Sequence, residues 1–198
     1  MNQSNSAVMS VTAACYDIFI DIATSIYCSM YNQSQVMMKT LGSSSNMWIV
    51  AAGTGCVGSG SNQLNGSRGI HVDQDLNLYV ADCGNNRVQK FLTLQIDAIT
   101  IAGSSAPGTI SLNCPSDVVL DGDGYLFIVD RNNHRIVGSS SNGYQCIIGC
   151  SGSGSTISQL SFPQSMAFDS YGNLYVTDSS NDRIQKFAIE KNDSGKRF

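Results

Sequence analysis

A recurrence of 48 residues runs through most of this 198-residue chain, and it constrains the fold more than any other feature. Residues 69–82, 117–130 and 165–178 align without a gap. Three sets of side chains recur at this interval: Asp73, Asp121 and Asp169; Asp82, Asp130 and Asp178; and Arg87, Arg135 and Arg183. A period of about 20 to 50 residues is typical of proteins built from equivalent units that stack on their neighbours.

A fourth, degraded copy begins 52 residues before the second one. It keeps the apolar frame at residues 18–21 and 26–27, but Met30 and Gln35 replace the second Asp and the Arg. We therefore expect four units within residues 14–187. The predicted organisation is an N-terminal segment over 1–13, repeats over about 14–52, 67–102, 115–149 and 163–187, and a polar tail over 188–198.

Each repeat contains four short apolar runs separated by turn residues, which is the pattern of a small antiparallel sheet. In the second copy these runs, a to d, are residues 70–72, 76–81, 88–91 and 96–102. Run a is apolar on both faces, as at residues 118–120, so both faces of each sheet must be covered. Sheets packed radially as the blades of a β-propeller cover one another in this way. We predict an all-β propeller of four-stranded antiparallel blades with almost no helix.

Residues 172–187 and 77–91 closely resemble the NHL repeat. The resemblance extends over about residues 14–187, and several fixed positions recur together in three copies. It implies a propeller, usually of six blades, that acts as a protein or RNA interaction module. Some members of the family are the recognition ends of tripartite-motif ubiquitin ligases, but this sequence has no RING or B-box cysteines and no coiled-coil heptads.

Four blades with the wedge of a six-bladed ring leave an open arc. The last copy also stops after run c, and residues 7–11 could supply its missing strand if the ring closed. We favour the open arc, or partial propeller. An arc exposes apolar blade faces at both ends, which predicts self-association or a missing remainder of the protein.

Function is expected on the face that carries both the b-to-c turns and the long d-to-a loops, because alternating strand directions bring these loops together. The loops from residues 54–67, 104–114 and 150–162 are rich in Gly and Ser. The candidate binding residues on this face are Arg68, Asn85, Asn86, Arg131, Asn132, Asn133, His134, Asn181 and Asp182. Our first hypothesis is a non-enzymatic scaffold module that binds a protein partner here, with no catalytic residue, metal or cofactor. Replacing Arg131 and His134 together is then expected to weaken binding without lowering the melting temperature.

The recurring Asp and Arg residues are assigned to structure rather than to chemistry. The Asp that ends each run b can accept backbone N–H bonds within its own turn and pair with the Arg five residues later.

Two alternatives use the same face. His134 occupies the position in which propeller lyases that cleave peptidyl-hydroxyglycine carry a zinc-binding His, so a metal-dependent lyase or hydrolase would use His134 and Asp182. The matching positions in the other copies hold Ser34, Asn86 and Asp182, and a single His does not make a zinc site. RNA binding would use Arg68 and Arg131, but a net charge of -4 and a pI near 4.9 argue against nucleic acid and against anionic membranes.

Other motifs carry weaker signals. Residues 53–58 match G-x-G-x-x-G, but the polar sequence that follows predicts a loop between blades rather than a helix for pyrophosphate. Residues 121–124 suggest a calcium loop but lack its twelfth-position Glu, so a hairpin turn is expected. His71 is expected to be a hydrogen-bonded core residue.

Seven cysteines leave at least one unpaired, and we favour buried free thiols over disulfides. The apolar run over residues 13–31 is interrupted by Asp17 and Asp21 and has no basic residue before it, so it is expected to be neither a signal peptide nor a membrane span. A cytosolic protein and a piece of a longer protein both fit this start.

Overall fold

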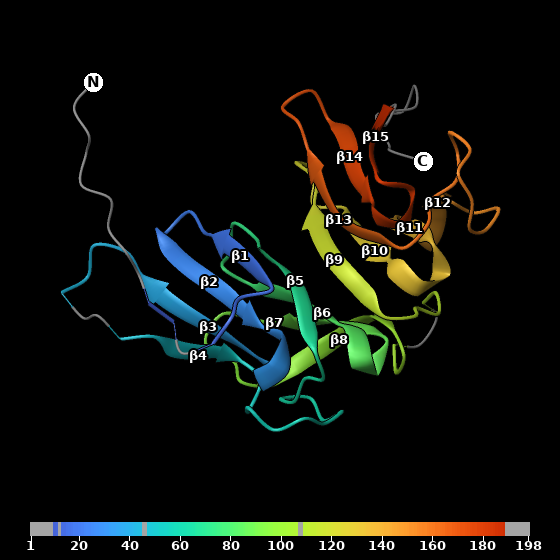
Figure 1. Ribbon diagram of the computed structural model, residues 1–198. Coiled ribbons are helices and arrows are strands. Elements are labelled where there is room, and N and C mark those ends of the chain that lie inside the picture. The colour runs from blue at the N-terminus through green and yellow to red at the C-terminus, as the bar shows by residue number, and fades with distance from the viewer. Residues whose placement is uncertain (1–9, 12, 45–46, 107–108, 189–198) are drawn as a thin grey trace, which may run out of the picture.

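The computed structural model describes residues 10–11, 13–44, 47–106 and 109–188, and within them it is all-β (Figure 1). The strands are β1 (Asp17–Ile20), β2 (Ser25–Met30), β3 (Gln35–Thr40), β4 (Ile49–Ala52), β5 (Ser67–Val72), β6 (Leu78–Asp82), β7 (Arg87–Phe91), β8 (Ala98–Gly103), β9 (Pro115–Leu120), β10 (Leu126–Asp130), β11 (Arg135–Ser140), β12 (Gly143–Ile148), β13 (Pro163–Phe168), β14 (Asn173–Asp178) and β15 (Arg183–Ala188). The helical elements in these ranges are four three-residue 3₁₀ turns: η1 (Tyr31–Gln33), η2 (Cys83–Asn85), η3 (Arg131–Asn133) and η4 (Ser179–Asn181).

The strands form four antiparallel sheets that follow the sequence repeats: blade 1 (β1–β4), blade 2 (β5–β8), blade 3 (β9–β12) and blade 4 (β13–β15). The first strand of each blade contacts the first strand of the next, β1 with β5, β5 with β9 and β9 with β13, so these strands surround a common axis. Figure 1 shows the blades following one another around this axis as an arc. The predicted four-bladed partial propeller is confirmed, and within the described residues its last blade has three strands.

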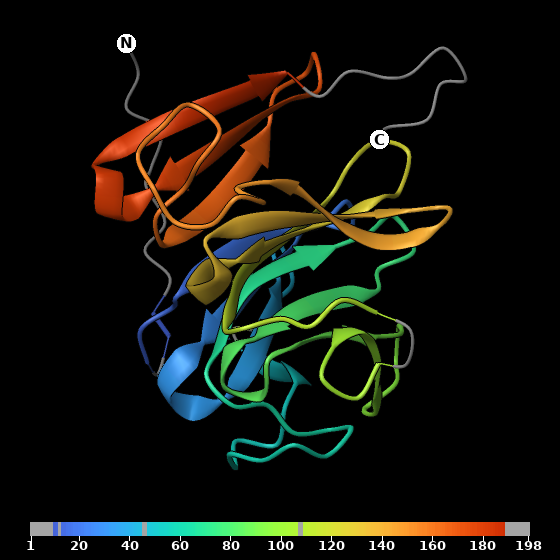
Figure 2. The same cartoon turned by 90° about the vertical axis from the view of Figure 1, so that its right-hand side faces the viewer.

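The core lies between the blades, in three apolar clusters. In Figure 2 the blades are stacked face to face. The cluster between blades 1 and 2 joins Tyr27 and Val36 to Ile70 and Leu78, and equivalent clusters fill the next two boundaries. We call the side of a blade that packs on the following blade its back face, and the opposite side its front face. This arrangement explains why the first strands are apolar on both sides.

The turn after strand b in blades 2 to 4 is organised by its buried Asp. The Asp82 carboxylate accepts hydrogen bonds from Arg87 Nε and Asn85 Nδ2 through Oδ2, at 2.7 and 2.8 Å, and from the Asn65 N–H through Oδ1 at 2.7 Å. Arg87 in turn donates to the carbonyl groups of Ser59, Gly60 and Gln63 in the incoming loop. The same Asp–Arg pair recurs as Asp130–Arg135 and Asp178–Arg183. One carboxylate therefore joins the turn to the loop from the preceding blade.

The turn between strands a and b is a tight hairpin in each of these blades. Asp73 Oδ1 accepts the N–H groups of Asp75 and Asn77, and Asp121 and Asp169 accept the matching N–H groups of their own turns. Residues 121–124 thus form the expected hairpin, with Gly124 at φ +82°. Residues 53–58 lie in the expected loop between blades, before β5.

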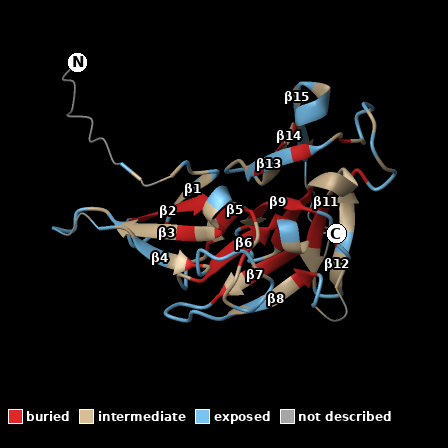
Figure 3. Cartoon of the chain, turned by 60° about the horizontal axis from the view of Figure 1, so that its bottom comes forward, coloured by how far each residue is buried: buried red, intermediate tan, exposed pale blue. Residues whose placement is uncertain are grey.

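Single aliphatic side chains are exposed at both ends of the arc, Ile18 and Ile20 in blade 1 and Ile184 in blade 4. In Figure 3 the buried residues concentrate in the middle blades, whereas β4 and β15 carry exposed residues. The carbonyl of Ser10 accepts a hydrogen bond from Trp48 Nε1 at 3.1 Å, which places residue 10 beside blade 1. Of the strand 7–11 considered for ring closure, residues 7–9 lie outside the described residues, as do residues 189–198 of the tail.

The expectation of free cysteines was wrong. Six of the seven are paired in disulfides, Cys15–Cys28, Cys83–Cys114 and Cys146–Cys150, and Cys56 is free and exposed. Cys83 and Cys114 belong to neighbouring blades, and spacing along one chain says nothing about such a contact. The other two pairs each join residues within or next to a single blade.

Candidate binding site at the propeller axis

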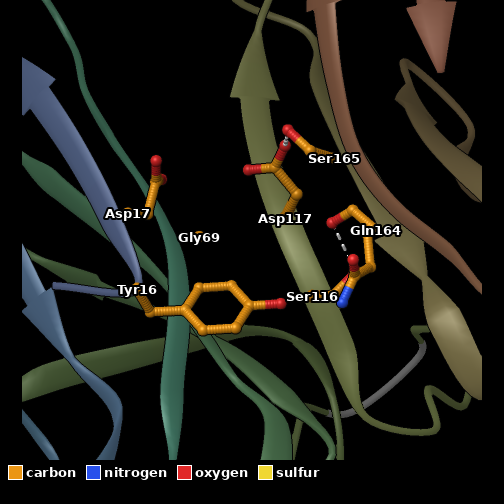
Figure 4. A pocket seen from close by; sticks show the side chains of 7 residues that line it. All are labelled: Tyr16, Asp17, Gly69, Ser116, Asp117, Gln164 and Ser165. Atoms are coloured by element: carbon orange, nitrogen blue, oxygen red, sulfur yellow. Dashed lines mark hydrogen bonds between the residues drawn. The ribbon is translucent and has the colours of Figure 1, made fainter. Parts of the chain in front are cut away.

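A pocket of about 300 Å³ lies on the axis, where all four blades meet. It is lined by Tyr16, Asp17, Gly69, Ser116, Asp117, Gln164 and Ser165 (Figure 4). These residues occupy two consecutive positions of the repeat at the beginning of each innermost strand. Because Ser67, at that end of β5, pairs with Asp82, the pocket lies near the face that carries the b-to-c turns. We call this the top face.

Two carboxylates face each other across the pocket, with Gly69 between them (Figure 4). Asp17 Oδ2 accepts the Ile70 N–H at 2.8 Å. Asp117 Oδ2 accepts the Met166 N–H at 2.8 Å and the Ser165 hydroxyl at 2.9 Å. Each carboxylate therefore bonds to an innermost strand of another blade. A Cβ at position 69 would collide with the backbone and carboxylate of Asp117, so Gly69 is what lets β9 approach β5 here.

Burial raises the pKa values of both carboxylates in this pair. It raises the pKa of Asp117 to about 7, against the lowering effect of the Met166 N–H, and the nearby charge of Asp17 adds to the rise. Burial also raises the pKa of Asp17. Near neutral pH the pocket thus holds Asp117 partly protonated, so this group can either donate or accept a hydrogen bond.

Arg68 lies outside this pocket, in an adjoining one that it lines together with Tyr16 and Tyr31. Its Nη1 donates to the Tyr16 hydroxyl at 3.3 Å, and its guanidinium lies 5.3 Å from the ring centroids of both Tyr16 and Tyr31. This predicted binding residue therefore positions the aromatic wall of the pocket. Stacking of a guanidinium on aromatic rings stabilises such a cluster by roughly 0.5–1 kcal/mol at exposed sites.

Three of the predicted binding residues support the turns. Asn85, Asn133 and Asn181 donate from Nδ2 to the buried Asp of their own turn at 2.8, 2.8 and 2.9 Å. Asn85 and Asn181 also donate to carbonyl groups of the incoming loops, at Gly58 and Gly154. Their amide groups are therefore committed to the fold.

A second group of side chains, in the turns after strand b, forms hydrogen bonds between neighbouring blades. Ser34 Oγ, Asn86 Oδ1 and His134 Nδ1 accept the N–H of Gly66, Cys114 and Phe162, at 3.1, 2.8 and 3.0 Å. In each case an acceptor in a left-handed turn residue of one blade binds the residue that precedes strand a of the next. Asp182 occupies the same position in blade 4, where it is exposed.

Arg131 and Asn132 complete the predicted set. The Arg131 guanidinium lies 5.1 Å from the Phe162 ring, and Asn132 Nδ2 donates to Asn113 Oδ1 at 3.3 Å. Tyr31 with Gly66, Cys83 with Cys114, and Arg131 with Phe162 are equivalent pairs across successive boundaries. The chain thus uses ring packing, a disulfide and a cation–π contact at one repeated junction. Because Arg131 and His134 both contact Phe162, their joint replacement is now expected to lower the melting temperature.

His71 packs against the Phe19 ring, with centroids 4.7 Å apart, and burial lowers its pKa to about 4. It lines a separate pocket at the opposite end of the axis, which is formed by the a-to-b turns of blades 1 to 3.

The axial residues were not predicted, because the predicted site was based on positions that recur in every copy. The first of the two axial positions holds Tyr16, Arg68, Ser116 and Gln164 in successive copies, and the second holds Asp17, Gly69, Asp117 and Ser165. The variation at these two positions was the available signal. Within the described residues, no three His, Cys, Asp or Glu side chains come close enough to hold a metal ion. Nor does the described part of the chain contain a helix long and apolar enough to cross a membrane.

The comparison that decides the family is with the NHL repeat, whose sequence profile matches residues 64–91, 112–138 and 160–187. The chain is an NHL-repeat protein. The three matches cover the first three strands of blades 2, 3 and 4 of the NHL propeller, and blade 1 is the degraded copy. No curated protein sequence matches the chain significantly.

Solved structures share the propeller fold. A protein of unknown function from Bacteroides thetaiotaomicron superposes with a TM-score of 0.69 at 18% identity, covering 86% of this chain and 46% of its own. A putative gluconolactonase gives 0.69 at 14% identity, covering 93% and 62%. Virginiamycin B lyase from Staphylococcus aureus gives 0.55 at 11% identity, covering 91% and 57%. The NHL chain therefore spans about half to three fifths of the length of these structures.

Proposed function

We propose that this NHL-repeat chain is a non-enzymatic binding module that holds a segment of a protein partner on its top face, with one polar side chain in the axial pocket. The proposal rests on a difference between two kinds of position in the repeat, those that recur in every copy and those that vary. The recurring Asp, Asn and Arg residues are engaged in turns and blade contacts. Two positions that vary between blades line the pocket instead.

The chemistry of the pocket suits a hydrogen-bonding side chain. Asp17, Asp117 and Gln164 provide oxygen acceptors, the Tyr16 hydroxyl provides a donor, and the Tyr16 ring forms one wall. Polar groups around one aromatic wall fix the orientation of a bound group and exclude poorly matched ones. Residue 16 is 40% exposed and Gln164 is also exposed, so a partner can reach both.

A double replacement, Tyr16→Ala with Gln164→Ala, tests the proposal. Peptides selected from a phage-displayed random library on the immobilised wild-type chain are expected to lose about tenfold in affinity for this variant, equivalent to about 1.4 kcal/mol. Calorimetry measures the affinity, and the melting temperature is expected to stay within a few degrees because both side chains are partly exposed.

The matched control replaces the same residue types away from the pocket, as Tyr171→Ala with Gln145→Ala. Tyr171 is 91% exposed and Gln145 is exposed on β12. This control is expected to bind the selected peptides like the wild type. Equal affinity for the wild type and the pocket variant would refute the site.

A further inference from the structure

The first of the two axial repeat positions includes a residue that lies outside the axial pocket. Tyr16, Ser116 and Gln164 line that pocket, whereas Arg68 lines the adjoining pocket of about 400 Å³. Tyr16 lines both pockets, so the two share a wall. The other residues that line the adjoining pocket are Ala14, Cys15, Tyr31 and Asn32. Arg68 is thus the charged residue of this pocket.

Arg68 differs from the recurring arginines in its lack of an acidic partner. Arg87, Arg135 and Arg183 each form an ion pair with the Asp of their own turn. Within the described residues Arg68 forms no ion pair, and its hydrogen bond from Nη1 to the Tyr16 hydroxyl uses one of five N–H donors. Its Nε is buried and has no acceptor there. The described part of the chain therefore leaves this positive charge uncompensated.

The surroundings of the Arg68 guanidinium favour an anion. The rings of Tyr16 and Tyr31, with centroids 5.3 Å away, hold the group and displace water from it. Partial removal of water makes an unpaired charge less stable and strengthens its attraction to an opposite charge. Tyr31 is 39% exposed and Asn32 is exposed, so neutral hydrogen-bonding groups lie beside the cation where a ligand can reach them.

A carboxylate suits this pocket better than a phosphate group does. The planar guanidinium matches the two oxygens of a carboxylate. Phosphorylated segments and nucleic acids are generally bound by several basic side chains, but this pocket has one and the chain has a net charge of -4. The acidic pair Asp17 and Asp117 lines the axial pocket, where it disfavours a second anion. The two pockets thus select different groups.

We propose that the partner segment carries an Asp or Glu whose carboxylate binds Arg68, while a neighbouring neutral polar side chain occupies the axial pocket. This inference rests on the proposed function, because it names the class of segment that the top face holds.

A double-mutant cycle on the full-length chain tests the inference, with peptides selected on the wild type as probes. The selected peptides are expected to share an acidic residue. One of them is synthesised with blocked termini, both as selected and with that acid replaced by its amide. The wild type is expected to bind the amide form about tenfold more weakly. Arg68→Gln is expected to bind the acidic form about tenfold more weakly than the wild type does, and to bind both forms equally. Calorimetry measures all four affinities.

Two further variants separate this inference from the proposed function. Gln164→Ala changes the axial pocket and not the adjoining one, so it is expected to weaken both forms of the peptide alike. Lys186→Gln is the matched control, because Lys186 Nζ also lies over a tyrosine ring, 5.5 Å from the Tyr175 centroid, but outside both pockets. It is expected to distinguish the two forms as the wild type does.

The peptide substitution leaves the protein unchanged, so a loss of affinity for the amide form cannot come from misfolding. Selected peptides that share no acid, or equal affinities of the wild type for the two forms, overturn the inference. The proposed function survives that result where Gln164→Ala still weakens binding. Peptides that bind independently of Gln164 overturn both, and a Lys186→Gln variant that loses the distinction overturns the assignment to Arg68.

Discussion

At the scale of single residues, aspartate side chains have two different roles in this chain, and the groups around each one decide which role it has. Asp82 is fixed by Arg87, Asn85 and a backbone N–H, so its charge is balanced within its turn. Asp117 is buried without a basic partner among its hydrogen-bond donors and lies near the charge of Asp17. The first arrangement stabilises the blade, and the second leaves a titratable group at the axis.

Stability is therefore expected to depend on the protonation of Asp117. Its pKa is about 7 in the folded chain against 3.8 for the unfolded chain, so its protonated form stabilises the fold. That contribution is complete below about pH 4 and is lost as the pH rises towards 7. The side chain in Asp117→Asn stays neutral at every pH, so the variant does not show this loss. The difference between the two melting temperatures, wild type minus variant, is therefore expected to fall by roughly 5–10 °C between about pH 5 and 8.

Differential scanning calorimetry of both proteins at each pH measures this difference, and subtraction removes the opposite contribution of His71, whose pKa is lowered. Asp169→Asn is the control. Hydrogen bonds from Asn173 keep the pKa of Asp169 below its ordinary value, so it is ionised throughout this range and its replacement is expected to leave the dependence in place. A constant difference for Asp117→Asn would contradict the assignment.

At the scale of elements, each four-stranded blade closes by a glycine at the end of its outer strand. Gly103 ends β8 at φ +87°, and a Cβ there would collide with the carbonyl oxygen of Asn86. Gly53 and Gly149 face the matching carbonyl groups of Ser34 and His134. The chain therefore leaves the outer strand and enters the next loop in direct contact with the backbone at the beginning of strand c. Only a residue without a side chain can occupy this position.

Gly103→Ala is expected to lower the free energy of unfolding by about 2 kcal/mol, because it combines a disfavoured backbone conformation with a steric collision. Urea denaturation followed by circular dichroism measures the change. Gly122→Ala is the matched control, since an added Cβ there meets nothing within 4 Å, and its unfolding free energy is expected to stay within about 0.5 kcal/mol of the wild type. A similar loss in both variants would show that the collision is not the cause.

At the scale of the whole molecule, stability depends on contacts between neighbouring blades. Each apolar cluster joins one blade to the next, as expected for a repeat array. One covalent link crosses such a boundary, the disulfide between Cys83 of blade 2 and Cys114 ahead of blade 3. It encloses a longer segment than the Cys146–Cys150 pair, with separations of 31 and 4 residues.

Removing the boundary disulfide is expected to cost more than removing the local one. From loop length, Cys83→Ala with Cys114→Ala should lose about 4 kcal/mol of unfolding free energy, and Cys146→Ala with Cys150→Ala about 2 kcal/mol. Guanidinium denaturation measures both. Mass spectrometry after alkylation checks the pairing directly, since Cys56 alone should react before reduction and all seven cysteines afterwards. Equal losses, or several reactive thiols before reduction, would contradict this account.

The sequence by itself determined the number of blades, their strand boundaries to within a few residues, the hairpins and the Asp–Arg turns. These features depend on spacing within one repeat, so the 48-residue period and its polar markers were sufficient to predict them. Only the tertiary structure decided that Asp17 and Asp117 share a pocket, that Cys83 pairs with Cys114, and that Ile18 and Ile184 remain exposed. Each of these joins or separates residues of different blades, and how one blade sits against another depends on packing across the axis rather than on neighbours along the chain.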